Sequence, residues 1–397
     1  MTGFTDRTIV LGADCAAVPE RLLLAHARGQ VLFITGAGVS QPSGLPSFRD
    51  LVQDVYKRVD ASTHAVIGPM PSGMKDEPIA SLALPARQRA EVQRFLRDEH
   101  DVVLGMLERR LEGDLEQRNI VREAVIDRLR QNDPKPSEIH RSLMRLSDRG
   151  GATAVITTNF DCLLEAASPP RSRAETYALG GIPRPTLRPE FSGVFHLHGA
   201  LAWSTRRASD LILTDQDFGE FYLRRRIVPD FIYDAARLFH LVLVGYSAND
   251  PPMRYLLNAV AADGTRFSDL KERFTFFGGK LPPDQVMIED WKGRGITPIT
   301  YDEADDHDQL RRTLSHWSAL SAINGSRSVL DRTLRQLVRA PRGRAAERDE
   351  DLFDHLIRRS DPNERVRIGR LISEAGADLD WLSAMTEVAN EPRSCGL

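Results

Sequence analysis

The sequence predicts an α/β protein with a doubly wound parallel sheet, a helical insertion and a helical C-terminal extension. Short apolar runs recur along most of the 397-residue chain, and patterns typical of helices separate them. Strands that alternate with helices indicate a parallel sheet. Several of these runs end in polar or glycine-containing segments, and such sheets bind ligands beyond the carboxyl ends of their strands. We therefore expect a Rossmann-like arrangement.

The strands are expected at residues 31–35, 154–157, 194–197, 241–244, 274–277 and 296–301. Helices are expected at residues 18–27 and 138–146, on either side of the first strand. Prolines crowd the stretch after Arg49, up to residue 85, so a loop is expected there.

Apolar residues recur at helical spacing from about residue 87 to residue 130. The expected domains are therefore a catalytic domain at 1–308, with a helical insertion at about 87–146, and a helical extension at 309–397.

The composition favours a cytoplasmic protein. The net charge is -3, which provides no general electrostatic reason to bind nucleic acid or a membrane. The chain has no apolar run long enough to span a bilayer, and its polar N-terminus does not resemble a signal peptide. Three separate cysteines suit a reducing compartment.

A glycine turn follows the first expected strand. Gly36 and Gly38 lack the Cβ atoms that would keep a pyrophosphate away from backbone N–H groups such as that of Ala37, and a helix start after the turn would favour an anion. The GxGxxG pattern is incomplete, because Gln41 stands at its third glycine. An ordinary tight turn would explain the two glycines taken alone.

The longer string at residues 36–49, GAGVSQPSGLPSFR, resembles the signature of the sirtuin family, GAGxSxxxGxPxFR. Residues 157–161, TTNFD, resemble the TQNxD box of that family, with Thr158 in place of glutamine. Residues 195–199, FHLHG, resemble the box that carries the catalytic histidine. Residues 241–247, LVLVGYS, resemble the second nucleotide-binding turn. The four segments stand in the order that the family shows.

This resemblance implies an enzyme that uses NAD+ as its substrate. His198 would accept a proton near the nicotinamide ribose, and imidazole titrates close to neutral pH. Asn159 would hold a ribose hydroxyl or the attacking water, since its amide both donates and accepts. Asp161 would accept a hydrogen bond from the nicotinamide carboxamide. The other expected cofactor contacts are Gly36, Ala37, Gly38, Ser40, Phe48, Arg49, Gly245, Ser247 and Asp302.

Each of these residues also has a structural interpretation. His198 could be a hydrogen-bonded strand-end residue, and Asn159 or Asp161 could cap a helix. Arg49 could form an ordinary salt bridge, whereas the resemblance would pair it with pyrophosphate. Asp302 could stabilise a turn instead of contacting adenosine. We interpret His196, the other histidine of residues 195–199, as structural.

The cysteine pattern separates two branches of the resemblance. Protein-deacylating sirtuins carry a structural zinc module with two CxxC pairs, whereas Cys15, Cys162 and Cys395 form no such pair. We therefore expect no metal. The resemblance then points to the bacterial sirtuin-like NAD-hydrolysing enzymes of phage defence.

The expected function is NAD+ glycohydrolysis, an NAD+ nucleosidase activity that depletes NAD in abortive infection. The alternatives are an NAD-dependent protein deacylase and a non-catalytic module that senses NAD or ADP-ribose. Such an enzyme needs control, so we expect a homo-oligomer that docks on a HerA-type ATPase or a short Argonaute. The supporting apolar face comprises Leu352, Phe353, Leu356 and Ile357, and packing of such a face on the same chain is the alternative. The arginine-rich tail suits either a solvated helix face or a nucleic-acid site.

Overall fold

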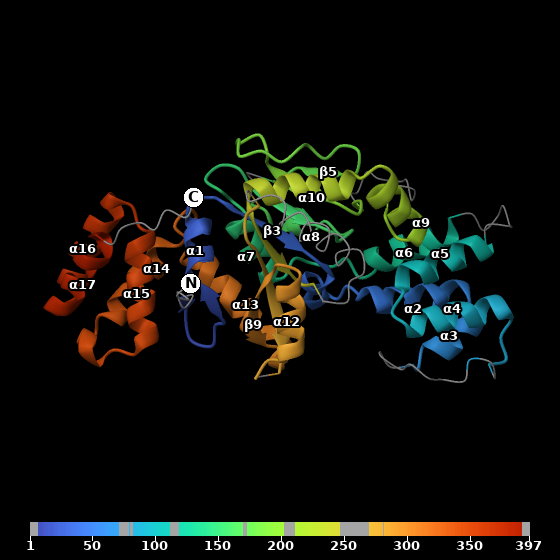
Figure 1. Ribbon diagram of the computed structural model, residues 1–397, viewed down its shortest axis with the longest axis horizontal. Coiled ribbons are helices and arrows are strands. Elements are labelled where there is room, and N and C mark those ends of the chain that lie inside the picture. Colours follow the sequence, from blue (N-terminus) through green and yellow to red (C-terminus); the bar gives the residue numbers. More distant parts are fainter. Residues whose placement is uncertain are drawn as a thin grey trace.

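A computed structural model of the protein describes residues 7–70, 79, 82–111, 119–169, 173–201, 211–246, 270–280 and 282–390. Three parts follow one another along the long axis of the molecule (Figure 1). The sheet and its covering helices lie in the middle, the helices of residues 48–130 lie at one end, and those of residues 327–390 lie at the other.

The central sheet has seven strands among the described residues, and every neighbouring pair is parallel. Their order across the sheet is β5 (Thr176–Ala178), β6 (Gly193–His196), β4 (Ala154–Thr157), β3 (Val31–Thr35), β7 (His240–Val244), β8 (Arg273–Gly279) and β9 (Thr297–Asp302). Strands β3, β4 and β6 are buried along their whole length. Because helices cover both faces of the sheet, these strands read as unbroken apolar runs.

The strand order places a topological switch point between β3 and β7. The chain runs from β3 to β4 on one side and later crosses back to β7, which pairs with β3 along all five of its residues. Without the edge strand β5, this order is that of doubly wound nucleotide-binding sheets. The predicted fold class is confirmed, and such sheets bind their ligands at the switch point.

All six expected strands are present, and their ends differ from the expected ones by at most two residues. The sequence analysis missed β5 and the antiparallel pair β1 (Thr8–Val10) and β2 (Ala17–Pro19). Each has three residues, which is too few to show an alternating pattern. The first helix begins at Glu20 and not at residue 18, because Val18 and Pro19 belong to β2.

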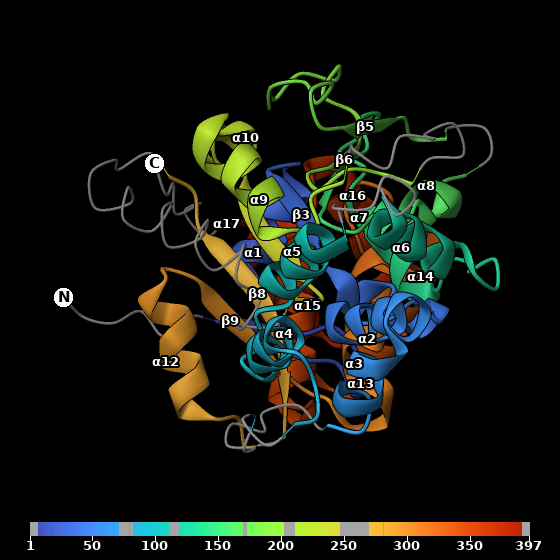
Figure 2. The same ribbon diagram turned by 90° about the vertical axis from the view of Figure 1, so that its right-hand side faces the viewer.

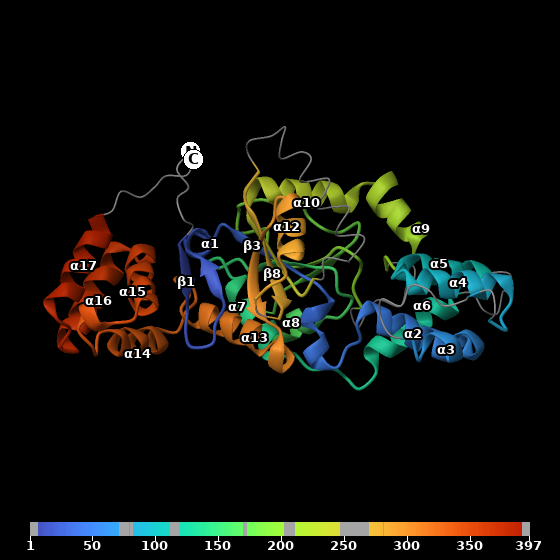
Figure 3. The ribbon, with the colours of Figure 1, turned by 60° about the horizontal axis from the view of Figure 1, so that its bottom comes forward.

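The helices around the sheet are α1 (Glu20–Ala27), α7 (Glu138–Leu146), α8 (Leu163–Ala167), α10 (Ile227–Leu238), α12 (Gln285–Gly293) and α13 (Ala304–Ala319). Side chains of β3 alternate between two cores, as the strand period requires. Phe33 belongs to the core shared with α1, α7 and α13, and Ile34 to the core shared with α10 and α12. Figure 3 shows α10 and α12 on one side of the sheet and α7 and α13 on the other.

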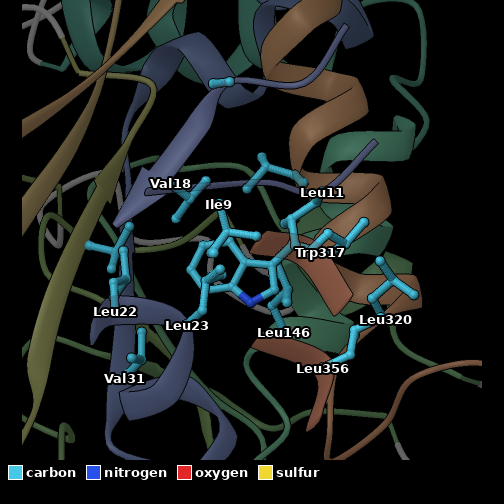
Figure 4. Packing of buried hydrophobic residues seen from close by; sticks show 14 of the residues in the cluster. Ile9, Leu11, Val18, Leu22, Leu23, Val31, Leu146, Trp317, Leu320 and Leu356 are labelled. Carbon is cyan, nitrogen blue, oxygen red and sulfur yellow. The ribbon is translucent and has the colours of Figure 1, made fainter. Parts of the chain in front are cut away.

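The first of these cores continues into the C-terminal helices, which are α14 (Arg327–Leu337), α15 (Glu347–Arg359), α16 (Pro362–Glu374) and α17 (Leu379–Asn390). Trp317 lies in its middle, with its ring centroid 5.6 Å from that of Phe33 (Figure 4). Leu356 packs here from α15. The apolar face of α15 is thus buried within the chain, as the same-chain alternative expected.

The helical insertion between β3 and β4 contains α2 (Phe48–Val59), α3 (Ala61–Ile67), α4 (Ala86–Leu96), α5 (His100–Leu111) and α6 (Ile120–Arg130). The expectation of a loop directly after Arg49 is wrong, because residues 48–67 are helical. Ser47 caps α2 by accepting the N–H of Asp50 at 3.1 Å, and Asp60 caps α3 by accepting the N–H of Thr63 at 3.0 Å. The prolines that suggested a loop begin only after α3. Much of that proline-rich stretch, residues 71–78 and 80–81, lies outside the described residues.

The insertion lies over the carboxyl end of the sheet. Seen along the long axis, its helices stand in front of the strands (Figure 2). Leu163 and Leu213, which follow the ends of β4 and β6, pack in the core of the insertion. Residues that follow these strands therefore lie between the sheet and the insertion. Within the described part of the chain, no helix has the length and apolar character needed to cross a bilayer.

Candidate active site

Two glycine turns meet at the switch point, one after β3 and one after β7. The N–H of Gly38 donates to the carbonyl oxygen of Gly245 at 3.0 Å. Gly245 has a φ of +75°, and a Cβ there would lie 2.6 Å from the backbone nitrogen of Val39. A Cβ at Gly36 would lie 2.7 Å from the carbonyl oxygen of Gly245. Glycine is required because the turns touch each other, which adds a structural reason to the expected approach of a pyrophosphate.

Most backbone N–H groups of the first turn already donate hydrogen bonds to protein carbonyls. It forms the short 3-10 helix η1 (Ala37–Val39). The N–H groups that donate to protein carbonyls are those of Gly36, Gly38, Val39 and Ser40. The N–H of Ala37 has no acceptor among the described residues, so it stays available to an anion.

Ser40 lies at the centre of a buried polar network. Its hydroxyl donates to Oδ2 of Asp161 at 2.9 Å and lies 3.3 Å from Nε2 of His140. The N–H of Ser137 donates to Nδ1 of His140 at 3.2 Å, so Nε2 carries the ring proton and points it at Ser40. Burial lowers the pKa of His140 to about 4, which keeps the ring neutral, and burial raises the pKa of Asp161.

Asn159 is held with its amide oxygen unoccupied. Its Nδ2 donates to the carbonyl oxygen of Gly36 and to Oγ of Ser40, both at 3.0 Å. The carbonyl can only accept, so the orientation of the amide is determined. Oδ1 has no partner among the described residues and can accept a hydrogen bond from a ribose hydroxyl or from water.

His198 occupies the corresponding position on the next strand. Thr157 pairs with His196 in the register of β4 and β6, so Asn159 and His198 both lie two residues beyond the pair. The side chain of His198 is buried, and its Nε2 lies 2.6 Å from the hydroxyl of Tyr222. Tyr222 belongs to the π-helix η7 (Gly219–Arg224). Burial lowers the pKa of His198 to about 3, so the imidazole is neutral at physiological pH.

His196 fixes the backbone at Asn159 through a hydrogen bond. Its Nδ1 lies 2.8 Å from the carbonyl oxygen of Asn159, and its Nε2 lies 2.8 Å from Oε1 of Glu165 on α8. Both partners accept, so the ring donates from both nitrogens and is charged. Burial would lower the pKa of His196, but the hydrogen bond and charge of Glu165 outweigh burial and raise it. This pair confirms the structural interpretation of His196 and ties α8 to the Asn159 backbone.

Three of the expected cofactor contacts lie away from Ser40, Asn159 and His198, and a fourth lies outside the described residues. Arg49 donates to Asp98 at 3.1 Å and to the carbonyl oxygen of Met70 at 2.9 Å, as the salt-bridge interpretation predicted. Phe48 packs in the core of the insertion. Asp302 ends β9, three strands from β3, and accepts the N–H of Ala304 at 3.0 Å, as the turn interpretation predicted. Ser247 lies outside the described residues.

Sequence reasoning missed the partners of the centre, which are His140, Ser137, Glu165 and Tyr222. None lies in one of the four boxes. His140, Glu165 and Tyr222 reach the site from helices, and Ser137 is the N-cap residue of α7. Glu165 stands four residues after Asp161, on the short helix α8. A carboxylate that is buried on such a helix needs a partner, and this was a usable signal.

One group of side chains could approach a metal ion within the part of the chain that the structure describes. Ligand atoms of Cys162, Glu165 and His196 lie within 4.8 Å of one another. Both nitrogens of His196 already donate to protein oxygens, so a metal would have to displace a proton there. The expectation of no structural zinc stays a prediction.

Comparison with known proteins places these boxes in a recognised domain. Residues 153–299, from β4 into β9, match the family model described as a SIR2-like domain. The matched residues include the Asn159 and His198 boxes and the second glycine turn. The match supports a sirtuin-like fold for this part of the chain.

Two relatives cover different shares of the chain. The uncharacterized protein y4cA of Sinorhizobium fredii is 33% identical over 300 residues, which are 74% of this chain and 22% of that protein. NAD-dependent protein deacylase 1 of Pseudomonas aeruginosa is 32% identical over 145 residues, which are 36% of this chain and 40% of that protein. The chain thus spans less than half the length of either relative.

One solved structure, titled "Structural Basis for the Mechanism and Regulation of Sir2 Enzymes", aligns with 75% of this chain and 93% of its own. The sequence identity is 14% and the TM-score is 0.35. A likeness this distant adds nothing to the strand order described above.

Proposed function

We propose that this protein is an NAD+ glycohydrolase, which cleaves the bond between nicotinamide and ribose. One observation carries the proposal: Asn159 and His198 project from adjacent strand ends beside the switch point, with a free amide oxygen on one and a neutral imidazole on the other. Binding alone does not require a proton acceptor next to an oriented amide. Hydrolysis of a glycosidic bond does.

The chemistry follows from these groups. Oδ1 of Asn159 accepts a hydrogen bond from the attacking water or a ribose hydroxyl. Water adds to C1′ of the nicotinamide ribose as the carbon–nitrogen bond breaks, and nicotinamide leaves with the electron pair of that bond. One proton of the water passes to His198 and then to solvent. The products are nicotinamide and ADP-ribose.

Burial keeps His198 neutral and so able to accept, but it also makes the ring a weaker base than the imidazole titrating near neutral pH that the sequence analysis expected. A neutral imidazole has one unprotonated nitrogen, which can take a proton or a hydrogen bond. In the described structure Tyr222 lies against its Nε2, so substrate has to share or displace that contact. The insertion over the strand ends would limit access of bulk water.

The test is incubation of the purified chain with NAD+ alone, followed by chromatography of nicotinamide and ADP-ribose. His198→Ala and Asn159→Ala are each expected to reduce turnover by about a hundredfold or more. His64→Ala, a partly exposed histidine on α3, is the matched control and is expected to retain activity. Wild-type turnover in the His198→Ala protein would refute the assignment.

Protein deacylation is the second candidate, and the similarity to the Pseudomonas deacylase favours it. Addition of an acyl-lysine peptide distinguishes the two. A deacylase consumes NAD+ only with the peptide present, whereas a glycohydrolase consumes it without. Binding of NAD+ without turnover in either mixture would instead support a sensing module.

We also propose that the enzyme acts in anti-phage defence as a homo-oligomer, docked on a HerA-type ATPase or a short Argonaute. The support is the sirtuin resemblance alone. The apolar face of α15 does not support an oligomer, because it is buried within the chain. Light scattering after size exclusion tests the oligomer, and a strictly monomeric, fully active enzyme would contradict it.

A further inference from the structure

A second site lies far from the switch point, where the sheet domain meets the C-terminal helices. An open cavity of about 390 Å³ lies between the C-terminal end of α13, the first turns of α14 and α16, and the last residue of α15. Its polar lining includes Ser321, Ser326, Arg327, Arg359, Asn363 and Arg367. Helices α14, α15 and α16 are at the end of the molecule opposite the insertion, and α13 lies beside the sheet (Figure 1).

Arg359 is the unusual member of this lining. Its Nε and Nη1 atoms are buried and have no hydrogen-bond partner among the described residues, whereas the residue as a whole is partly exposed. Burial lowers the pKa of this guanidinium, and the charge of Glu364 opposes that effect without forming a hydrogen bond to either atom. Buried donor atoms that lack an acceptor are unfavourable, and such atoms call for an explanation.

The opposite side of Arg359 holds no anion either. There the side chain borders a small apolar space together with His26 and His355. Burial lowers the pKa of both histidines and so favours their neutral form, and an imidazole cannot act as a counter-ion to a guanidinium. Leu320 and Leu356, which Figure 4 shows side by side, close this space from the core. Neither space beside Arg359 supplies a bonded counter-ion from the described residues, and the open cavity gives an anion access to this side chain.

Two helices direct their positive ends at the same cavity. Helix α14 has Ser326 at its N-cap with no side-chain cap, and the N–H groups of Arg327 and Ser328 have no acceptor among the described residues. Helix α16 begins beside the cavity at Pro362. N-termini of helices of this length favour anions.

Counted with Asp331, the carboxylates at the cavity balance its three arginines, but none of them bonds to Nε or Nη1 of Arg359. Asp361 accepts the N–H of Glu364 at 2.9 Å and so caps α16. Arg367 pairs with Asp331 at 2.5 Å. Three arginines and two carboxylates line the cavity, and Arg359 stays without a bonded partner.

We propose that this cavity binds a small molecule that bears a phosphate group, with Arg359 as its main contact. A guanidinium donates two parallel hydrogen bonds to phosphate, and a phosphate has further oxygens for the free N–H groups of α14. The volume lies in the range of sites for small ligands. This inference is independent of the proposed NAD+ chemistry.

The test measures thermal unfolding and calorimetric binding of the full chain with inorganic phosphate or AMP. Chloride holds the ionic strength constant. Both ligands are expected to raise the melting temperature saturably. Tighter binding of AMP identifies a nucleotide site, and equal binding identifies a site for the phosphate group alone. Absence of a saturable response to both would overturn the proposal.

Arg359→Met removes the buried charge and keeps the volume. We expect it to melt at or above the wild-type temperature in chloride, to lose the phosphate response, and to keep wild-type NAD+ turnover. Arg370→Met, an exposed position on α16, is the matched control and should keep the response. Arg359→Lys retains the charge but lacks the planar guanidinium that donates two parallel hydrogen bonds, and it should bind phosphate at least tenfold more weakly. A full phosphate response in both Arg359 variants would show that the anion binds elsewhere, for example at the switch point.

Discussion

Replacement of Glu165 by glutamine tests whether the buried pair behind Asn159 organises the candidate site. The carboxylate accepts hydrogen bonds from His196 at 2.8 Å and from Thr176 at 2.7 Å, and it is almost fully buried. Removing one partner of such a pair costs about 3–5 kcal/mol. We expect Glu165→Gln to lower the free energy of unfolding by about 3 kcal/mol. This loss is at the lower end of the range because His196 can release its proton.

The effect depends on pH with a defined sign. The pKa of Glu165 is lowered from 4.5, so its contribution is present above pH 4.5 and is lost as the pH falls through the folded value. The pKa of His196 is raised from 6.5, so its contribution is present below pH 6.5 and is lost as the pH rises through the folded value. The difference between wild type and Glu165→Gln is therefore largest between pH 4.5 and 6.5.

Urea denaturation of both proteins across this range measures the difference, and Glu190→Gln, an exposed glutamate, is the control. NAD+ turnover should fall by about tenfold to a hundredfold, because the carbonyl of Asn159 loses a fixed donor and its amide shifts. Equal stability of Glu165→Gln and wild type at all pH values would refute the charged pair.

Further predictions concern the turns, the pH profile and metal. Gly245→Ala should destabilise the protein by at least about 2 kcal/mol in denaturation, because its φ of +75° and the nearby nitrogen of Val39 both oppose a Cβ. Gly293→Ala, with open space around it, should change stability little. The kcat/KM for NAD+ should show no inflection between pH 5 and 6.5, since burial lowers the pKa of His198 to about 3, and an inflection there would contradict its neutral state. Elemental analysis should find no stoichiometric zinc.

The strands and the boxes at their ends could be predicted because their signals are local. A buried parallel strand is a short apolar run, and the polar segment that follows it marks the carboxyl edge. This placed Asn159, His198 and both glycine turns at one edge before any contact was known. Helices α2 and α3 were missed because the prolines after residue 68 dominated the interpretation of a segment whose caps, Ser47 and Asp60, precede them.

By itself, the sequence determined six strands of the sheet and the chemical types of the residues at their ends, since these depend on neighbours along the chain. The strand order and its switch point come from the tertiary structure. Only the tertiary structure decided the protonation states and partners of these residues. His198 is neutral and His196 is charged although they are two residues apart, because one is buried against Tyr222 and the other against Glu165. Burial and distant partners set a pKa, and neither can be read from local spacing.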